Sequence, residues 1–472
     1  MRPWSMCERY ARCTLSVALA EGRRLCHPLS GLWHHLLMTH CVLSGHLVTV
    51  SLLDHQTFIT DNTGQQRGTT GVREGRARSR TTPGHVARRL LLSSARTREG
   101  NPPDVVLHTL LAVADMDHTR IRAVSRIQVC RESQGGRAMT CRIGINGLGR
   151  IGRMVLRRTM TLQDVEVVAV NDRARLGDLA YLLTYDSVHG LFPGEVTDDA
   201  RSLLVNGTAV QFSSETEPAK IPWGQAGVDV VIESTGAFRG RQDAAGHLHA
   251  GARKVLISAP SDDVDATLVP GVNDAQYDRT HHHVISMASC TTNSLAPVAK
   301  VLQDQFGIVH LFITTVHAYT TSQAILDKPT RHRRRGRAGA VSMIPTSTGA
   351  AQATALVIPA LAGKMDGMAI RVPVPDGSVT DIVAELATAT TVQEINDGLR
   401  NAAQRPPLQG ILAVSDDELV SVDIIGNPHS AIVDAPSTKV LNGTMAKVLS
   451  WYDNEWGYAC RLAELAGRLL TS

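Results

Sequence analysis

The residues best suited to chemistry in this sequence are one cysteine and one histidine. Cys290 lies between Ser289 and Thr291 and is followed 27 residues later by His317. Serine and threonine cap free N–H groups at the start of a helix, so the segment predicts a thiol at a helix N-terminus. The partial positive charge of that terminus favours the nucleophilic thiolate, and a neighbouring histidine would lower the thiol pKa further and move protons. The alternative is a half-buried structural cysteine, which is the commoner role of a single cysteine.

A glycine-rich turn has the pattern of a dinucleotide-binding site. A short strand-like run leads into Gly147, Gly149 and Gly152, and an apolar helical run follows. The first glycine permits the tight turn, the second lets a pyrophosphate approach the backbone, and the third allows the helix to pack closely on the strand. A second predicted strand, residues 165–170, leads to Asp172, whose carboxylate would accept hydrogen bonds from ribose hydroxyls. We therefore expect a Rossmann-type dinucleotide-binding domain of the α/β class rather than a purely structural turn.

Further strands are expected on both sides of the cysteine. Residues 228–233 and 254–258 continue the α/β rhythm, and the small residues that follow them would line a ligand cleft or merely end the strands. After the cysteine, strands alternate less regularly with helices, which predicts a separate α+β catalytic domain with a mixed sheet. The strands expected there are residues 308–316, 368–374, 382–386 and 421–425.

The first 138 residues differ in composition from the rest of the chain. They contain no lysine and lack a sustained helical or strand period, and residues 67–98 are rich in Gly, Thr, Ser and Arg. They also lack the charged, apolar and small-residue order of a signal peptide. We expect a disordered extension of residues 1–138 with no assigned domain, translated from an upstream start, so that Met139 begins the functional chain. A disordered organelle-targeting arm is the alternative.

Charge and cysteine content argue against several classes of partner. The chain has 48 basic and 44 acidic residues, a formal charge of +4, and no apolar run of the ~18 residues that a membrane span needs. Its eight cysteines form no C-x-x-C pair, so we expect reduced thiols and no metal site. The basic run at residues 330–337 is typical of a solvated loop, with a nucleic-acid patch or a clamp for an anionic substrate as alternatives. We expect no nucleic-acid or membrane partner.

Several long motifs, in order, resemble phosphorylating glyceraldehyde-3-phosphate dehydrogenase, and the likeness covers roughly residues 140–472. They are the glycine turn, the centre around Cys290, and residues 185–190, 233–236, 315–320, 344–351 and 450–458. The resemblance implies that Cys290 attacks an aldehyde and that His317 serves as the base while hydride passes to NAD. Inorganic phosphate then attacks the resulting thioester.

The resemblance also implies a set of binding residues. Those for NAD are Gly147, Gly149, Arg150, Ile151, Gly152, Asp172, Ser258 and Asn454. Those for the substrate phosphate and the attacking phosphate are Ser289, Thr291, Thr320, Arg335, Arg337, Thr348, Gly349 and Arg371. Because Asn454 precedes a final helix, we expect the NAD-binding domain to span residues 139–289 and to be completed by residues 455–472. Residues 290–454 would form the catalytic domain.

At two positions the sequence differs notably from the pattern that is usual in this family. Met287 stands where asparagine is usual, and we expect it to alter local packing rather than chemistry. Arg173 follows Asp172 and would attract a 2′-phosphate, whereas Pro329 matches the form of the basic loop found with NAD; we expect NAD.

The resemblance further implies a cytoplasmic, glycolytic homotetramer that takes glyceraldehyde 3-phosphate and inorganic phosphate. Erythrose-4-phosphate dehydrogenase is the nearest rival, and the semialdehyde dehydrogenases share the thiol chemistry but not the long motifs. A non-catalytic binding paralogue is the rival from another class. That hypothesis predicts loss of catalytic residues, yet Cys290, His317, Arg371 and Asn454 are all present.

Overall fold

The computed structural model describes residues 16–17, 37–43, 46–53, 56–60 and 140–471, and the chain divides into two compact units, Met1–Arg137 and Ala138–Ser472. In the first unit an antiparallel sheet joins four strands in sequence order. They are β1 (Ser16–Val17), β2 (Leu37–Leu43), β3 (His46–Leu53) and β4 (Gln56–Thr60). No domain was expected in residues 1–138, but β3 is rich in Leu, Val and Thr, which favour paired strands. The expected unstructured segment at residues 67–98 and the expected start at Met139 lie outside the described residues.

The second unit contains two large sheets, one in each half of its sequence. Its first half has β5 (Cys141–Asn146), α1 (Arg150–Thr159), β6 (Val165–Asn171), α2 (Leu176–Thr184), β7 (Tyr185–Asp186), β8 (Gly190–Leu191), β9 (Val196–Asp198), β10 (Ser202–Val205), β11 (Thr208–Ser213), α3 (Trp223–Ala226), β12 (Val230–Glu233), α4 (Arg241–Ala244), α5 (Gly246–His249), β13 (Lys254–Ile257), β14 (Ala266–Thr267) and β15 (Val284–Ser286). Its second half has α6 (Cys290–Phe306), β16 (Ile308–Ala318), β17 (Ile344–Ser347), α7 (Ala350–Val357), β18 (Met365–Val372), β19 (Ser378–Leu386), α8 (Val392–Ala403), β20 (Leu412–Ser415), α9 (Ser421–Ile424), β21 (Ala431–Leu441), β22 (Met445–Tyr452) and α10 (Trp456–Arg468).

The first sheet has nine strands in the order β14-β15-β13-β12-β5-β6-β11-β10-β9. The strands from β14 to β11 pair in parallel, while β10 and β9 add an antiparallel edge. Parallel strands are covered on both faces, and accordingly five of the six residues of β5 and six of the seven residues of β6 are buried. Since the parallel strands point the same way, their carboxyl ends share one edge of the sheet, where ligands bind in such folds.

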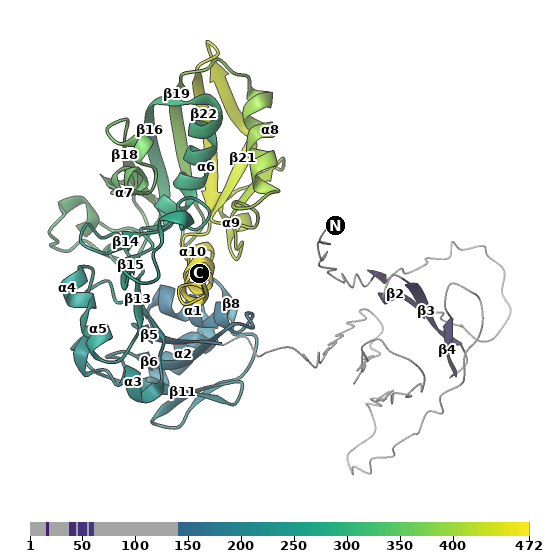
Figure 1. The fold of residues 1–472 in the computed structure, drawn as a ribbon, viewed down its shortest axis with the longest axis vertical. Coiled ribbons are helices and arrows are strands. Elements are labelled where there is room, and N and C mark those ends of the chain that lie inside the picture. Colours follow the sequence, from purple (N-terminus) through teal and green to yellow (C-terminus); the bar gives the residue numbers. More distant parts are fainter. Residues whose placement is uncertain (1–15, 18–36, 44–45, 54–55, 61–139, 472) are drawn as a thin grey trace, which may run out of the picture. The chain divides into compact units, whose positions relative to one another are not determined.

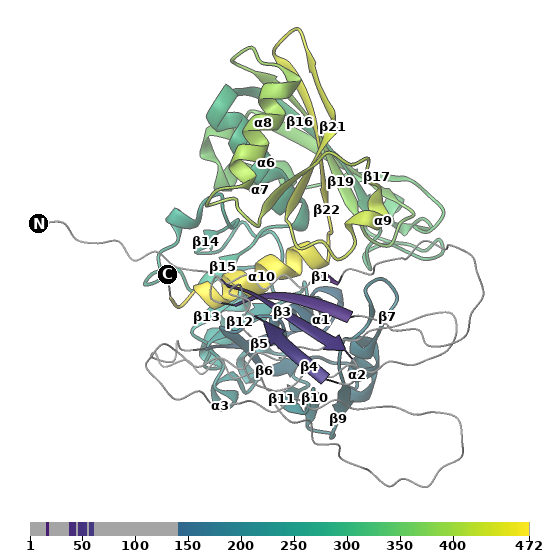
Figure 2. The same ribbon diagram turned by 90° about the vertical axis from the view of Figure 1, so that its right-hand side faces the viewer.

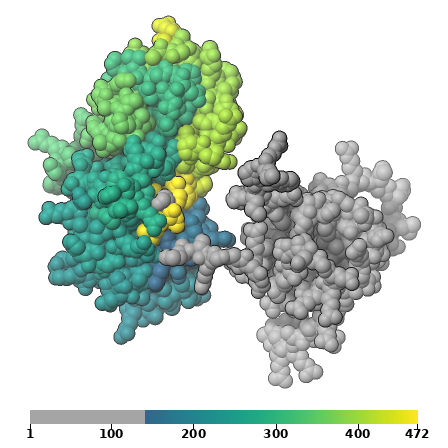
Figure 3. Space-filling model, viewed as in Figure 1, coloured from purple at the N-terminus to yellow at the C-terminus, as the bar shows by residue number. Residues whose placement is uncertain are grey.

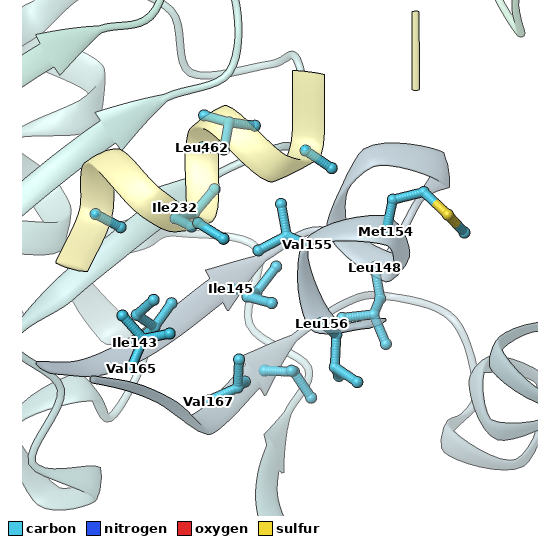
Figure 4. Packing of buried hydrophobic residues seen from close by; sticks show 14 of the residues in the cluster. Ile143, Ile145, Leu148, Met154, Val155, Leu156, Val165, Val167, Ile232 and Leu462 are labelled. Carbon is cyan, nitrogen blue, oxygen red and sulfur yellow. The ribbon is translucent and has the colours of Figure 1, made fainter. Parts of the chain in front are cut away.

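The C-terminal helix α10 belongs to the core of this first sheet. Leu462 and Ala463 are fully buried in one apolar cluster with Ile145, Val155 and Ile232. Figure 4 shows Leu462 on the yellow helix beside Ile232 and Val155, with Ile145 below. In the space-filling view, yellow atoms lie between the blue-teal half and the green half of the second unit (Figure 3). A helix remote in sequence therefore completes the dinucleotide-type core.

The second sheet is mixed, with the order β17-β18-β16-β19-β22-β21-β20. Helices α6 and α8 pack on one face of it (Figures 1 and 2), and Leu302 of α6 and Leu399 of α8 share an apolar cluster with Ile313 and Ile382 of the sheet. The predicted α/β architecture with a second, mixed-sheet part is confirmed.

One predicted strand is wrong. Residues 421–425 were expected to form a strand because of their branched apolar side chains, but Ser421–Ile424 is a short helix, α9. The Asp423 carboxylate accepts a hydrogen bond from the Val420 backbone N–H at 2.9 Å, which stabilises a helix start. Val422 is 66% exposed, so the apolar run does not supply a buried strand face.

Within the described part of the chain, no helix combines the length and the apolar character needed to cross a membrane.

Candidate functional site

The glycine turn between β5 and α1 has the geometry that each of its glycines was expected to need. Gly147 has φ +93°, and a Cβ there would lie 2.8 Å from the Thr235 backbone nitrogen. A Cβ on Gly152 would lie 2.1 Å from the Gly147 carbonyl oxygen, whereas one on Gly149 would meet nothing within 4 Å. The turn is thus closed on its inner side and open above Gly149, which fits a pyrophosphate approaching the backbone.

The start of α1 is also open to an anion. Gly149 is the N-cap residue, no side chain caps the helix, and its first turn has no acidic residue. The N–H groups at this end therefore remain available to a phosphate, and Arg150 and Ile151 contribute their backbone here.

The side chain of Arg150 does not extend toward this opening. It forms ion pairs with Asp186 of β7 and with Glu455, just before α10. Burial opposes ionisation of Asp186, but hydrogen bonds from Arg150 and from two backbone N–H groups hold its pKa at about 2. Arg150 therefore ties the glycine turn to the segment that carries Asn454.

Asp172 and Ser258 lie at the carboxyl edge of the nine-stranded sheet. Asp172 follows β6, and its Oδ2 accepts a hydrogen bond from the Leu148 N–H at 2.7 Å. Ser258 follows β13, and its N–H donates to the Glu233 carbonyl at 2.9 Å. The strands β6, β5, β12 and β13 are adjacent and parallel, so both residues share an edge with the glycine turn. The structure brings these cofactor candidates together.

Cys290 is the first residue of α6, as the capping pattern suggests. Ser289 is the N-cap, and its Oγ accepts a hydrogen bond from the Thr292 N–H at 3.0 Å. The Cys290 Sγ lies 3.5 Å from Nε2 of His317, which lies near the end of β16. The predicted thiol–imidazole pair is therefore within hydrogen-bonding distance across two elements of the second half.

The protonation of this pair differs from the sequence expectation. Burial raises the pKa of the Cys290 thiol to about 11, against opposing contributions from Arg371 and from hydrogen bonds involving Thr291. Burial, and then the Arg371 charge, lower the pKa of His317 to about 3. We expected a lowered thiol pKa, but desolvation outweighs the helix terminus and the nearby cation. The pair is a neutral thiol beside a neutral imidazole at pH 7.

Strand register places Arg371 beside the imidazole. His317 of β16 pairs with Arg371 of the parallel strand β18. The Ala318 carbonyl oxygen lies 2.7 Å from Nδ1 of His317 and accepts a hydrogen bond from Nη1 of Arg371 at 2.9 Å. Nη1 of Arg371 also lies 2.9 Å from Nδ1, but its proton can go to the Ala318 carbonyl instead. With the Nδ1 proton directed at the same carbonyl, Nε2 is the acceptor that faces Cys290. Nε of Arg371 is buried without a hydrogen-bond partner, so the guanidinium retains capacity for an anion.

The basic loop contributes one arginine to this neighbourhood. Nε of Arg335 donates to Thr346 Oγ1 at 3.0 Å, and the charge of Arg335 contributes to the lowered pKa values of both His317 and Arg371. Arg337, the other arginine expected there, instead forms an ion pair with Asp327 at 2.7 Å and is 67% exposed. The structure brings only Arg335 close to the Cys–His pair.

The remaining hydroxyl groups that were expected to bind phosphate already lie within hydrogen-bonding distance of other protein groups. Thr320 and Thr348 are half-buried; Thr320 Oγ1 lies 2.8 Å from Ser322 Oγ, and Thr348 Oγ1 accepts from the Ala350 N–H. The Thr291 Oγ1 lies 2.8 Å from the Tyr452 hydroxyl. Gly349 is the exposed N-cap of α7, with no capping side chain and no acid in the first turn, so the start of α7 remains open to an anion.

Tyr452 is a site residue that the sequence reading did not single out. Its hydroxyl contacts Thr291 Oγ1 and, at 2.9 Å, Thr315 Oγ1, and its ring packs edge-on against His317 at 6.0 Å. Burial raises its pKa above the ordinary value, so the phenol stays neutral. The signal available was its place in the residue 450–458 motif, two residues before Asn454.

Met287 is fully buried in the core of the nine-stranded sheet. Its carbonyl oxygen accepts a hydrogen bond from Asn293 Nδ2 at 2.9 Å, while its side chain packs with apolar neighbours. Met287 therefore contributes to the packing beneath the start of α6, and its lack of effect on the chemistry stays a prediction.

A buried acidic cluster lies behind Asn454. Among the described residues, His189, Asp376 and Glu455 form a group whose ligand atoms are close enough to surround a metal ion. Nε2 of His189 is 3.1 Å from Glu455 Oε2 and 3.4 Å from Asp376 Oδ2. Arg150 already pairs with Glu455, and burial followed by the charge of Asp453 raises the pKa of Asp376 to about 9. At neutral pH Asp376 is therefore a protonated acid.

Asp376→Asn is expected to raise the free energy of unfolding at pH 7 by on the order of 2 kcal/mol. The ordinary pKa of the carboxyl is 3.8, so between about pH 4 and pH 9 the folded state holds a proton that the unfolded state releases. Wild-type stability therefore falls as pH rises through this window, whereas the neutral amide is insensitive. Denaturant unfolding from pH 4 to pH 9 would measure the difference, with the half-exposed Asp397→Asn as control. A stability difference that is independent of pH would contradict the assignment.

The structure combines a dinucleotide-binding fold, which carries the glycine turn, with a mixed-sheet part that carries a Cys–His pair. This combination defines a class of dinucleotide-dependent enzymes that use a thiol, and similarity to known proteins identifies the family to which the chain belongs. Residues 141–241 match the glyceraldehyde 3-phosphate dehydrogenase NAD binding domain, and residues 289–454 match the C-terminal domain of the same family. The chain belongs to the glyceraldehyde-3-phosphate dehydrogenase family.

Curated relatives align with this chain over nearly their whole length. Over 328 residues the chain is 55% identical to the glyceraldehyde-3-phosphate dehydrogenase of Geobacillus stearothermophilus and 54% identical to glyceraldehyde-3-phosphate dehydrogenase 1 of Bacillus subtilis (strain 168). Each match covers 70% of this chain and 98% of the relative. The enzyme of Mycolicibacterium smegmatis is 51% identical over 335 residues, which are 69% of this chain and 98% of that relative.

Proposed function

We propose that this chain is an NAD-dependent, phosphorylating dehydrogenase that converts D-glyceraldehyde 3-phosphate to 1,3-bisphosphoglycerate in glycolysis. The observation that carries the proposal is the 3.5 Å approach of Cys290 Sγ to His317 Nε2, with Arg371 on the adjacent strand. The family match and the open glycine turn support the same conclusion.

The first chemical step is attack of the Cys290 sulfur on the aldehyde carbon. The thiol is neutral in the resting site, so its proton must leave as the S–C bond forms. His317 Nε2 is the acceptor within reach, and the carbonyl oxygen becomes the hydroxyl of a thiohemiacetal once it takes up a proton. The Arg371 charge makes the imidazolium costly, so His317 passes its proton on readily.

The second step removes hydride from the thiohemiacetal carbon while His317 takes the hydroxyl proton, which leaves a thioester on Cys290. NAD, when bound, supplies the hydride acceptor. Residues at the carboxyl edge of the nine-stranded sheet would hold it: the glycine turn and the start of α1 at the pyrophosphate, Asp172 at the ribose, and Asn454 and Ser258 at the nicotinamide.

The third step is attack of inorganic phosphate on the thioester carbon, which releases the acyl phosphate and restores the thiol. Two anions must be accommodated, the substrate's own phosphate and the attacking one. Arg371, with a free buried Nε, and the half-buried Arg335 provide the positive charge. The uncapped start of α7 at Gly349 provides backbone N–H groups.

An assay of the purified full chain tests this function. With glyceraldehyde 3-phosphate and NAD, we expect steady NADH formation only when inorganic phosphate is present. Without phosphate, the thioester should accumulate and give a burst of about one NADH per site. Steady turnover that does not depend on phosphate, or faster turnover of erythrose 4-phosphate, would contradict the proposal. The same assay with NADP tests whether Arg173 relaxes the preference for NAD.

We also propose a cytoplasmic homotetramer. Several large apolar side chains are exposed on the neighbouring strands β16 and β18 and in the segment between β16 and β17, and contiguous exposed apolar patches are typical of interfaces. They are Phe312, Ile325, Leu326, Val341, Met343 and Met368. Free thiols at Cys141, Cys290 and Cys460 are compatible with a reducing compartment. Sedimentation equilibrium of the full chain would measure the assembly, and a monomer at micromolar concentration would refute it.

A further inference from the structure

Ser378 joins the two halves of the active site through one hydroxyl. It is the first residue of β19 and is fully buried. Its Oγ accepts a hydrogen bond from the backbone N–H of Ala318, the residue after His317, at 3.1 Å. The same Oγ donates to Oδ1 of Asn454, the residue expected at the nicotinamide.

The donor and acceptor in each of these two hydrogen bonds follow from the single proton that the Ser378 hydroxyl carries. A serine hydroxyl has one proton, and the Ala318 N–H can only donate, so that bond uses an oxygen lone pair. The hydroxyl proton is then free for an acceptor, which is Oδ1 of Asn454. The bond fixes the amide orientation of Asn454 and leaves its Nδ2 with no acceptor among the described residues.

Among the described residues, Ser378 alone forms a hydrogen bond with the Asn454 side chain. Asn454 is 6% exposed, and the residues on either side of it are held elsewhere: Asp453 accepts backbone N–H groups of Glu455 and Trp456, and Glu455 pairs with Arg150. Thr380 lies two residues along β19 from Ser378, and its buried Oγ1 has no partner. This hydroxyl on the same face of the strand therefore makes no hydrogen bond to the Asn454 amide.

We propose that Ser378 is a positioning residue for the nicotinamide end of the cofactor, acting through the Asn454 amide, and that it couples this amide to the strand end that carries His317. The inference rests on the proposed function because it assumes that a nicotinamide dinucleotide binds at the carboxyl edge. It concerns a residue that touches neither the reacting carbon nor the sulfur.

The test separates the nicotinamide end from the rest of the dinucleotide. ADP-ribose has the adenosine, pyrophosphate and second ribose but no nicotinamide. By isothermal titration of the full chain, Ser378→Ala is expected to weaken NAD binding by about tenfold and to leave ADP-ribose binding unchanged. Ser378→Cys, which has a slightly larger side chain and a weaker donor, should have an NAD affinity between those of the wild type and the alanine variant, and it guards against a folding defect in the alanine variant.

A double-mutant cycle shows whether the effect passes through the amide. If Ser378 acts through Asn454, Ser378→Ala should weaken NAD binding much less in an Asn454→Ala background. Thr380→Val removes an unpartnered hydroxyl from the same strand and should leave both affinities unchanged.

Each alternative outcome has a distinct meaning. Unchanged NAD affinity in folded Ser378→Ala, equal weakening of NAD and ADP-ribose, or additive effects in the cycle would each overturn the positioning role. Failure of the wild-type protein to bind either ligand would instead refute the dinucleotide site and with it the proposed function.

Discussion

Cys290→Ser is expected to lower turnover of glyceraldehyde 3-phosphate by at least about 10⁴-fold, the scale seen when a covalent nucleophile is lost. The reason lies in the protonation of Cys290 and His317 before substrate binds. His317 is a neutral imidazole whose pKa is depressed by burial and then by Arg371, so it is a weak base. It can accept the proton of a thiol as the S–C bond forms, but a serine hydroxyl is far less acidic and is a poorer nucleophile.

The measurement is steady-state NADH formation together with the burst in the absence of phosphate, and both should vanish in Cys290→Ser. NAD affinity should stay within about twofold because the role proposed for the Cys290 side chain is attack on the substrate, not contact with the pyrophosphate or ribose. Cys460→Ala is a suitable control, since Cys460 is a fully buried thiol on α10 and burial raises its pKa to about 12. Retention of the phosphate-free burst in Cys290→Ser would rule out Cys290 as the acylated residue.

His317→Gln should reduce kcat by about 10³-fold, within the usual range for a general base. Glutamine offers a polar amide at a similar reach but cannot take up a proton. In the proposed mechanism the same imidazole accepts the thiol proton and later the thiohemiacetal hydroxyl proton, so both attack and hydride transfer should slow. Alkylation of Cys290 by iodoacetamide, which needs only removal of the thiol proton, should therefore slow as well.

His310→Gln is a matched control for this substitution. His310 lies on the same strand, β16, but is exposed and pairs with Glu385 at 3.1 Å. Its replacement should change neither kcat nor the alkylation rate. Normal alkylation of Cys290 in His317→Gln, combined with low kcat, would restrict His317 to the hydride-transfer step and contradict its part in thiol attack.

The parts of the molecule that sequence predicted well are those encoded locally. The glycine turn follows from backbone sterics within a few residues, and the structure shows a tight Gly147, an open Gly149 and a packed Gly152. The start of α6 at Cys290 follows from the Ser289 cap. Such features depend on neighbours in sequence, so a single chain without any relatives carries the information.

The features that sequence did not anticipate depend on contacts between segments that are distant in the chain. Arg337 was expected at the phosphate because it resembles an arginine of the family's basic loop, whereas in the structure its side chain forms an ion pair with Asp327, ten residues earlier. The thiol pKa was expected to fall because the helix terminus is visible in sequence, whereas the depth of burial that raises it is not. Tyr452 and Ser378 acquire their contacts only when β22 and β19 pair in register with each other.

The packing of α10 against α1 and β5 also has a consequence for how this protein can be divided. A fragment that ends near residue 289 would contain the entire glycine turn, yet it would leave Ile145, Val155 and Ile232 without the helix that covers them. It would also lose Glu455, the partner that holds Arg150. The nucleotide-binding half is therefore not a transferable module: grafting it onto another enzyme, or exchanging it between relatives, requires that the final helix travel with it.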